Sequence, residues 1–122
     1  MGHDFDDLSG KVIEAAMAVH RELGPGFLES VYQRAMQVSL LNRGIPYEQQ
    51  KEIQITFEGI SVGCHRLDII VAGELILELK AVQSFEDFHF AQLKSYLKAT
   101  GLRVGLLLNF NAATLAIKRV VL

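Results

Sequence analysis

This chain has little cysteine and no long apolar run, and both observations exclude some classes of protein. Cys64 is the only cysteine in 122 residues, which excludes an internal disulfide and a cysteine-rich zinc module. No apolar run approaches the roughly 18 residues that a membrane-spanning helix needs. The first eight residues are acidic and contain neither the basic nor the apolar region of a signal peptide. We therefore expect a cytoplasmic protein that does not contact membranes.

An excess of positive charge is also missing. Twelve Lys and Arg residues stand against fourteen Asp and Glu residues, a net charge of −2, which excludes a histone-like polycation. The last third of the chain, residues 85–122, nonetheless holds five basic residues and two acidic ones. These bases are either a contact surface for an anionic polymer or ordinary solvated positions. They are Lys94, Lys98, Arg103, Lys118 and Arg119.

Apolar residues make up 50% of the chain, and their spacing predicts two helices at its start. Residues 9–23 have apolar side chains at helical spacing and stop at Gly24-Pro25, a helix end followed by a breaker. The second helix covers residues 28–43, and we expect it to bury one apolar stripe. The members of that stripe are Leu28, Val31, Tyr32, Ala35 and Val38.

The apolar period then changes from helical to alternating, which predicts strands. A third helix, residues 84–100, interrupts them, and Ser84 and Asp87 are spaced as a capping box at its start. The expected strands are residues 52–57, 60–71, 74–81, 104–110 and 115–122. The order ααβββαββ predicts a single α/β domain over residues 1–122, with a central mixed sheet flanked by helices.

Charged residues on two neighbouring strands are the feature with chemical meaning. Glu78 and Lys80 are two positions apart on a strand and so share a face, and Asp68 lies on the preceding strand. Buried charges of this kind are costly when unpaired. Either this face of the sheet is exposed to solvent, or the charges neutralise one another, or a cation such as Mg²⁺ or Mn²⁺ lies between the carboxylates.

The turn between these strands decides whether Asp68 and Glu78 can meet. A two-residue turn at Ala72-Gly73 would pair Asp68 with Leu77 and direct it away from Glu78. A turn with an odd number of residues, or a bulge, would put both carboxylates on one face. We therefore expect an odd turn or a bulge, and a regular two-residue turn would count against a metal site.

Several motifs in this chain occur together in one known family. Gly26, Glu29 and Tyr32 form the pattern G-x-x-E-x-x-Y, and Gln92 and Tyr96 form the pattern Q-x-x-x-Y. Further matching segments are Arg66-Leu67-Asp68, Glu78-Leu79-Lys80, Asn109-Phe110 and Lys118-Arg119, with Leu67 standing where Ala is usual. The chain thus resembles the GxxExxY family of small bacterial and archaeal proteins, in the PD-(D/E)xK nuclease superfamily, and its Q-x-x-x-Y pattern is similar to that of RecB-like members. The resemblance implies a restriction-endonuclease-like core.

The resemblance also implies roles for individual residues. Asp68 and Glu78 would bind a Mg²⁺ or Mn²⁺ ion together with the main-chain carbonyl of Leu79, and Lys80 would be the catalytic lysine. Glu29 would add a helical carboxylate to the metal site. The residues expected to contact nucleic acid or steady the site are Gln92, Tyr96, Lys94 and Lys98.

Structural roles compete with some of these assignments. Glu29 is also a favourable anion in the first turn of a helix, and Gln92 and Tyr96 are also suited to packing a helix on a sheet. His89 is expected to face solvent, although it could touch substrate. Other residues are expected to be structural: His20 as a helix-surface or a satisfied core residue, Tyr32 as a core residue with its hydroxyl bonded at the rim, and Cys64 as a small apolar filler.

Three functions remain open at this stage. The first is a metal-dependent nuclease that hydrolyses DNA, acting as a homodimer or with a partner protein because one small domain offers little surface for grasping a duplex. The second is a catalytically silent nucleic-acid-binding or protein-interaction module on the same fold. The third is a structural dimer without metal affinity.

Overall fold

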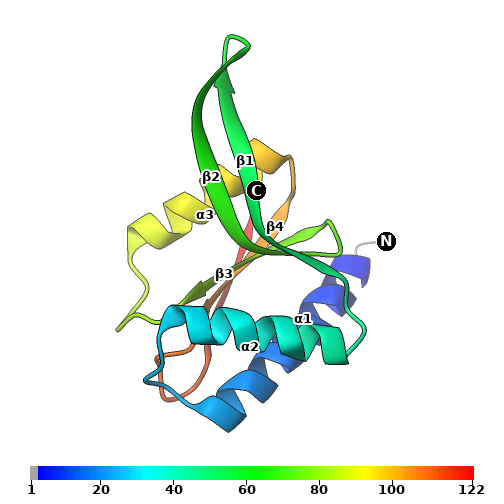
Figure 1. Ribbon diagram of the computed structural model, residues 1–122, viewed down its shortest axis with the longest axis vertical. Helices are drawn as coiled ribbons and strands as arrows, with labels where there is room; N and C mark the ends of the chain where they lie inside the picture. Colours follow the sequence, from blue (N-terminus) through cyan, green and yellow to red (C-terminus); the bar gives the residue numbers. More distant parts are fainter. Residues whose placement is uncertain (1–2) are drawn as a thin grey trace.

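The strands of the described part of the chain form one mixed sheet, in the order in which they occur in the sequence (Figure 1). The computed structural model describes residues 3–122. The elements are α1 (His3–Leu23), α2 (Glu29–Asn42), β1 (Tyr47–Phe57), β2 (Ile60–Val71), β3 (Leu75–Lys80), α3 (Asp87–Thr100), β4 (Val104–Asn109) and β5 (Ala116–Val121). Only β3 and β4 pair in parallel, and the other neighbours are antiparallel. The predicted order ααβββαββ and the predicted mixed sheet are confirmed.

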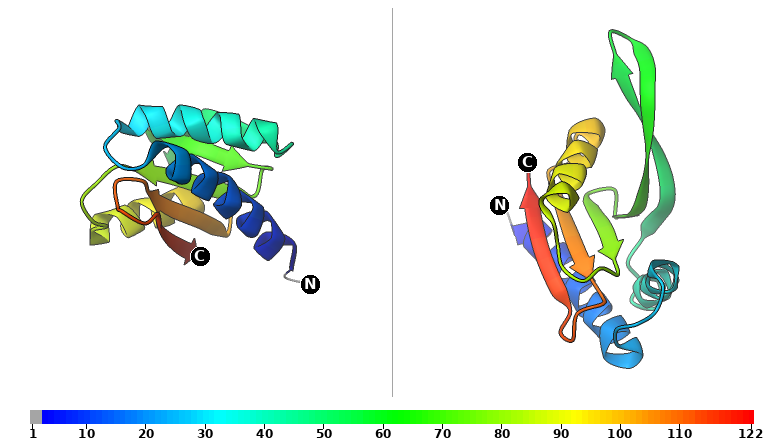
Figure 2. Two further views of the ribbon diagram at one scale, coloured as in Figure 1. Left: turned by 90° about the horizontal axis from the view of Figure 1, so that it is seen from below. Right: turned by 90° about the vertical axis from the view of Figure 1, so that its left-hand side faces the viewer.

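Helices cover both faces of this sheet (Figure 2). On one face, α1 and α2 pack against Leu75, Leu77 and Leu79 of β3. On the other face, α3 packs against Ile76 of β3 and Leu107 of β4. The alternation of β3 thus separates two hydrophobic clusters, and it puts the side chains of positions 78 and 80 on the α3 face.

The apolar stripe predicted for α2 is largely wrong. The side chains of Leu28, Val31 and Val38 are exposed, whereas Met36 and Leu40 are buried together with Tyr32. Tyr32, Met36 and Leu40 are four positions apart, so they form one face of the helix. Because α2 has two apolar faces at helical spacing, periodicity alone could not decide which one meets the sheet.

A long hairpin projects from the body of the molecule (Figure 1). The ladder between β2 and β3 covers only residues 69–71 of β2, while β1 and β2 continue to pair with each other up to Phe57 and Ile60. We call residues 51–67 the arm. β1 begins five residues before the predicted strand, because pairing with β2 continues beyond the alternating segment. Cys64 is exposed on the arm, so its prediction as an apolar filler is wrong.

The start of α3 also differs from the prediction. The helix begins at Asp87 and its N-cap is Glu86, so the capping box assigned to Ser84 and Asp87 is wrong. The reciprocal partner is His89, whose Nδ1 accepts the Glu86 amide at 2.8 Å. The His89 ring is buried and lies against Phe85 and Phe88. His89 therefore does not face solvent as predicted.

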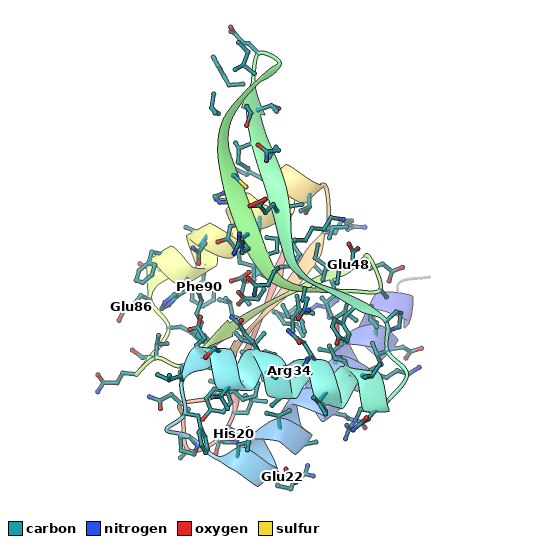
Figure 3. The ribbon with its side chains drawn as sticks, viewed as in Figure 1. His20, Glu22, Arg34, Glu48, Glu86 and Phe90 are labelled. Atoms are coloured by element: carbon teal, nitrogen blue, oxygen red, sulfur yellow. The ribbon has the colours of Figure 1, made fainter. Side chains whose placement is uncertain are left out.

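The other boundaries lie close to the predicted ones, except that α1 begins at His3 rather than at residue 9. His20, near the end of α1 (Figure 3), has its Nε2 2.8 Å from the carbonyl oxygen of Ala112 and is satisfied within the protein, as expected. Within the described residues, no helix combines the length and the apolar character needed to cross a membrane.

Candidate active site

The turn between β2 and β3 puts Asp68 on the face of Glu78. Val71 pairs with Leu75, so the turn consists of residues 72–74, an odd number. Both Ala72 and Gly73 have positive φ, 53° and 68°, which lets the chain reverse in this short space. The predicted odd turn is confirmed, and with it the condition for bringing the two carboxylates together.

The carboxylates of Asp68 and Glu78 connect the two strands where their ladder ends. The amide of Leu79 donates to Oδ2 of Asp68 at 3.0 Å, and the amide of Asp68 donates to Oε1 of Glu78 at 3.5 Å. These side-chain contacts follow directly after the last ladder pair, Ile69 with Leu77. Both carboxylates are therefore held by main-chain donors of the opposite strand.

The carbonyl of Leu79 points to the same edge of β3 as its amide. In an extended strand the amide and the carbonyl of one residue face the same neighbour, and the amide of Leu79 faces Asp68. The next residue, Lys80, shows the alternation, because its carbonyl accepts the amide of Phe110 on the β4 side at 2.9 Å. The Leu79 carbonyl thus lies on the side of the Asp68 carboxylate.

Lys80 completes a compact charged group. Its Nζ is 3.9 Å from Oε2 of Glu78 and 3.4 Å from Oε1 of Gln92 on α3. The side chain of Lys80 is 15% exposed and that of Glu78 only 4%. Gln92 therefore holds the ammonium group of Lys80 near Glu78.

Burial changes the proton affinity of both carboxyl groups. Desolvation and the nearby charge of Asp68 raise the pKa of Glu78 to about 8, against the lowering effect of Lys80. Desolvation also raises the pKa of Asp68, and the Leu79 amide opposes that shift. Ionising both buried carboxyl groups at once costs free energy because the two negative charges repel each other. The pair therefore holds a proton or a cation.

Glu29 lies within electrostatic range of this pair. It is in the first turn of α2, and its negative charge contributes to the raised pKa of Asp68. One turn further along the same helix face, Oε1 of Gln33 accepts from Nε2 of Gln50 in β1 at 3.3 Å. This face of α2 thus meets the base of the arm, next to the position of Asp68.

Tyr32 fixes the loop from which α2 begins. Its ring is fully buried and stacks on Phe110 with centroids 4.8 Å apart. Its hydroxyl donates to the carbonyl of Gly24 at 2.5 Å and accepts the amide of Phe27 at 3.2 Å. The predicted core position with a bonded hydroxyl is confirmed, and the bonds tie the loop that precedes Glu29.

Tyr96 lies beside the carboxylates on the α3 side. The residue is 6% exposed, and burial together with the charges of Glu78 and Asp68 raises the pKa of its hydroxyl to about 12. Its ring also contacts that of His65 on the arm, with centroids 4.6 Å apart. Sequence reasoning missed His65, because only the twist of the arm brings this strand position to α3 and no sequence pattern signals that twist.

Asn109 is a second residue that sequence reasoning left without a role. It is buried at the end of β4, and its side chain bonds both the amide and the carbonyl of Val82, at 3.1 and 2.8 Å. This fixes the segment that leaves β3 directly after Lys80.

The predicted basic residues do not gather in one place. Lys98 lines a groove between α3 and the arm, whereas Lys94 is exposed and lies outside the lining of that groove. Lys118 and Arg119 are successive residues of β5 and so project to opposite faces. The excess charge of the last third is thus divided mainly between α3 and β5.

The donor set is suited to a hard divalent cation. Two carboxylates and a main-chain carbonyl offer oxygen ligands, and a cation would relieve the repulsion that raises both carboxyl pKa values. No group of three or more His, Cys, Asp or Glu side chains at metal-binding distance occurs in the described part of the chain. Water and substrate would therefore fill the other positions, as is usual for Mg²⁺.

Comparisons with known proteins identify the family and a similar fold. The model of the family described as the PD-(D/E)XK nuclease superfamily matches residues 6–120. No curated protein matches the chain. The crystal structure of SSO0001 is similar in fold, with a TM-score of 0.57 and 19% sequence identity. That similarity covers 75% of this chain and 48% of the other, so this chain matches about half the length of that protein.

Proposed function

Because the chain belongs to the PD-(D/E)XK nuclease superfamily, we propose that it is a metal-dependent phosphodiesterase that hydrolyses DNA. The observation that carries this proposal is the convergence of Asp68, Glu78 and Lys80 on one face of the sheet, with Lys80 Nζ 3.9 Å from Glu78. A structural domain gains nothing from burying two adjacent carboxylates whose pKa values rise.

Each residue of the site would have a different role in the reaction. Asp68, Glu78 and the Leu79 carbonyl would hold Mg²⁺ or Mn²⁺, which when bound stabilises negative charge on a phosphate. Lys80, steadied by Gln92, would orient the attacking water, either taking its proton or acting as a fixed positive charge. Tyr96 would shield the carboxylates from solvent, and Glu29 would add negative charge from α2.

We also propose a narrower family, a cellular compartment and an oligomeric state for this protein. The intact pattern of Gly26, Glu29 and Tyr32 supports membership of the GxxExxY family, and the pair Gln92 and Tyr96 beside the carboxylates supports a RecB-like site. The free, exposed thiol of Cys64 suits a reducing compartment such as the cytoplasm. Exposed apolar side chains on α2, including Val38 and Leu41, support a homodimer or a partner protein.

A catalytically silent module is the second candidate. The dispersed bases and the net charge of −2 favour it, since a duplex-grasping nuclease usually presents a basic surface. It would keep the fold and bind nucleic acid or protein without turnover.

Calorimetric titration with Mg²⁺ and Mn²⁺ separates these candidates. We expect binding by the wild type, loss of binding in Asp68→Ala, and unchanged binding in Glu74→Ala, which removes an exposed carboxylate of the β2–β3 turn. Cleavage of single-stranded, duplex or branched DNA by the wild type, absent in Asp68→Ala, would support the nuclease. Metal binding without cleavage of any substrate would favour the silent module, and no metal binding would leave a structural dimer.

A further inference from the structure

A groove of about 430 Å³ lies between the arm and α3. Residues 54–56 of β1 and His65 of β2 line one side, and Ser95 and Lys98 of α3 line the other. The lining mixes hydroxyl, amide, imidazole and ammonium groups with apolar surface. Such a lining is suited to a ligand that is both polar and partly flat.

The groove lies next to the candidate active site. His65 lines the groove and its ring contacts that of Tyr96, at 4.6 Å between centroids. Tyr96 in turn lies one turn after Gln92 on α3, and Oε1 of Gln92 is 3.4 Å from Nζ of Lys80 in the candidate active site. A chain-like ligand bound at the carboxylates could therefore continue along His65 to Lys98.

We propose that this groove binds a single strand of nucleic acid where it leaves the active site. The inference rests on the proposed function and adds the form of the substrate. Lys98 supplies a cation for a phosphate, and the half-exposed His65 supplies a ring for a base, the pairing that single-strand-binding grooves use. The volume is that of a small-ligand pocket, which about one or two nucleotides fill and a duplex cannot enter.

Lys94 provides a matched control within the same helix. It has the same side chain as Lys98 and lies one turn earlier on α3, but it does not line the groove. A general electrostatic attraction would use both lysines equally, whereas a built strand path uses Lys98.

The test measures the affinity of a short fluorescein-labelled oligothymidylate by fluorescence anisotropy, with Ca²⁺ as the divalent cation. We expect His65→Ala to weaken binding about fivefold or more, the low end of the effect of losing one stacking platform. Lys98→Ala should weaken binding more than Lys94→Ala does, because it removes the cation that lines the groove. Lys94→Ala should stay within about twofold of the wild type, since the charge that it removes lies outside the lining of the groove. His65→Gln, which keeps a polar group but no ring, should match His65→Ala, and thermal melts verify that each variant is folded.

Two results would overturn the inference: equal effects of Lys94→Ala and Lys98→Ala, or tighter binding of a duplex of the same length. An oligouridylate series run in parallel reports whether the strand is DNA or RNA, and groove-dependent binding of either supports the inference. The metal titration reports on the proposed function separately. If the wild type binds metal but the groove variants bind the oligonucleotide as well as the wild type does, only the proposed strand path is refuted. If oligonucleotide binding depends on the groove but the protein binds no metal, the proposed hydrolysis is refuted.

Discussion

The carboxyl group of Glu78 binds a proton more tightly in the folded chain than in the unfolded chain. Its pKa is raised from 4.5 to about 8, mainly by burial and secondarily by Asp68. Between these pH values the folded state holds a proton that the unfolded state has released. The free energy of unfolding therefore falls as the pH rises through this window and levels off above about pH 8.

Glu78→Gln should flatten this pH dependence. The neutral amide removes the linked proton, so the variant should lose less stability between pH 5 and pH 8 than the wild type, by up to about 1.4 kcal/mol per pH unit. Urea unfolding at several pH values measures the difference. Glu74→Gln, which removes an exposed carboxylate, should follow the wild-type curve, and a Glu78→Gln curve parallel to the wild type would refute the assignment.

The hydroxyl of Tyr32 is a second residue-scale case. Tyr32→Phe leaves the carbonyl of Gly24 and the amide of Phe27 without this partner and should cost about 1–2 kcal/mol in unfolding free energy. Tyr47→Phe serves as a control, because no hydroxyl bond from Tyr47 is found within the described residues. Equal stability of the two variants in urea unfolding would contradict a bonding role for Tyr32.

Packing between α3 and β4 depends on the absence of a side chain at Gly105. A Cβ at this position would lie 2.7 Å from Cδ1 and 3.0 Å from Cγ of Leu93, which is fully buried. The side chain of Leu93 thus occupies the space that a methyl group at position 105 would need.

Gly105→Ala should lower the unfolding free energy by about 1–3 kcal/mol, the usual effect of overpacking a core. Gly63→Ala is the matched control, since Gly63 is also a strand glycine and a Cβ there meets nothing within 4 Å. Thermal and urea unfolding compare the two. The penalty should shrink in a Leu93→Ala background, and an undiminished penalty would mean that Leu93 is not its cause.

At the scale of elements, period and turn parity were enough to predict most of the architecture. The alternation of β3 correctly separated its two faces, and the odd turn correctly put Asp68 with Glu78. The buried face of α2 was not predictable, because Val31 and Val38 form as regular a stripe as Tyr32, Met36 and Leu40. The cap of α3 was missed because the ring nitrogen of His89 accepts the N-cap amide, and no common capping pattern contains a histidine at that position. Ser84 and Asp87 have the usual spacing of a capping box, and so they were predicted in its place.

The molecule as a whole has a body with two hydrophobic clusters and an arm with little core of its own. In the arm, Ile53 and Ile55 are only half-buried, while Phe57, Ile60 and Val62 are exposed. Figure 2 shows the hairpin extending past the layered body. The twist of the arm toward α3, which no sequence pattern revealed, is what brings His65 to Tyr96.

Hydrogen exchange should divide β2 into two segments. Amides of residues 69–71 lie between two strands and belong to the body, whereas residues 60–67 pair only with β1. We expect the arm amides to exchange at least about tenfold faster than those at 69–71, because local opening there exposes little apolar surface. Uniform protection along the whole strand would show that the arm and the body open together.

The exposed tip of the arm also offers a place to add sequence. Glu58 and Gly59 form its turn, both with positive φ, and neither belongs to either hydrophobic cluster. Exposed turns of this kind tolerate insertions well. A short peptide tag or a dye attachment site introduced between these two residues would report on the protein from a point far along the hairpin, with the carboxylates at its base left intact.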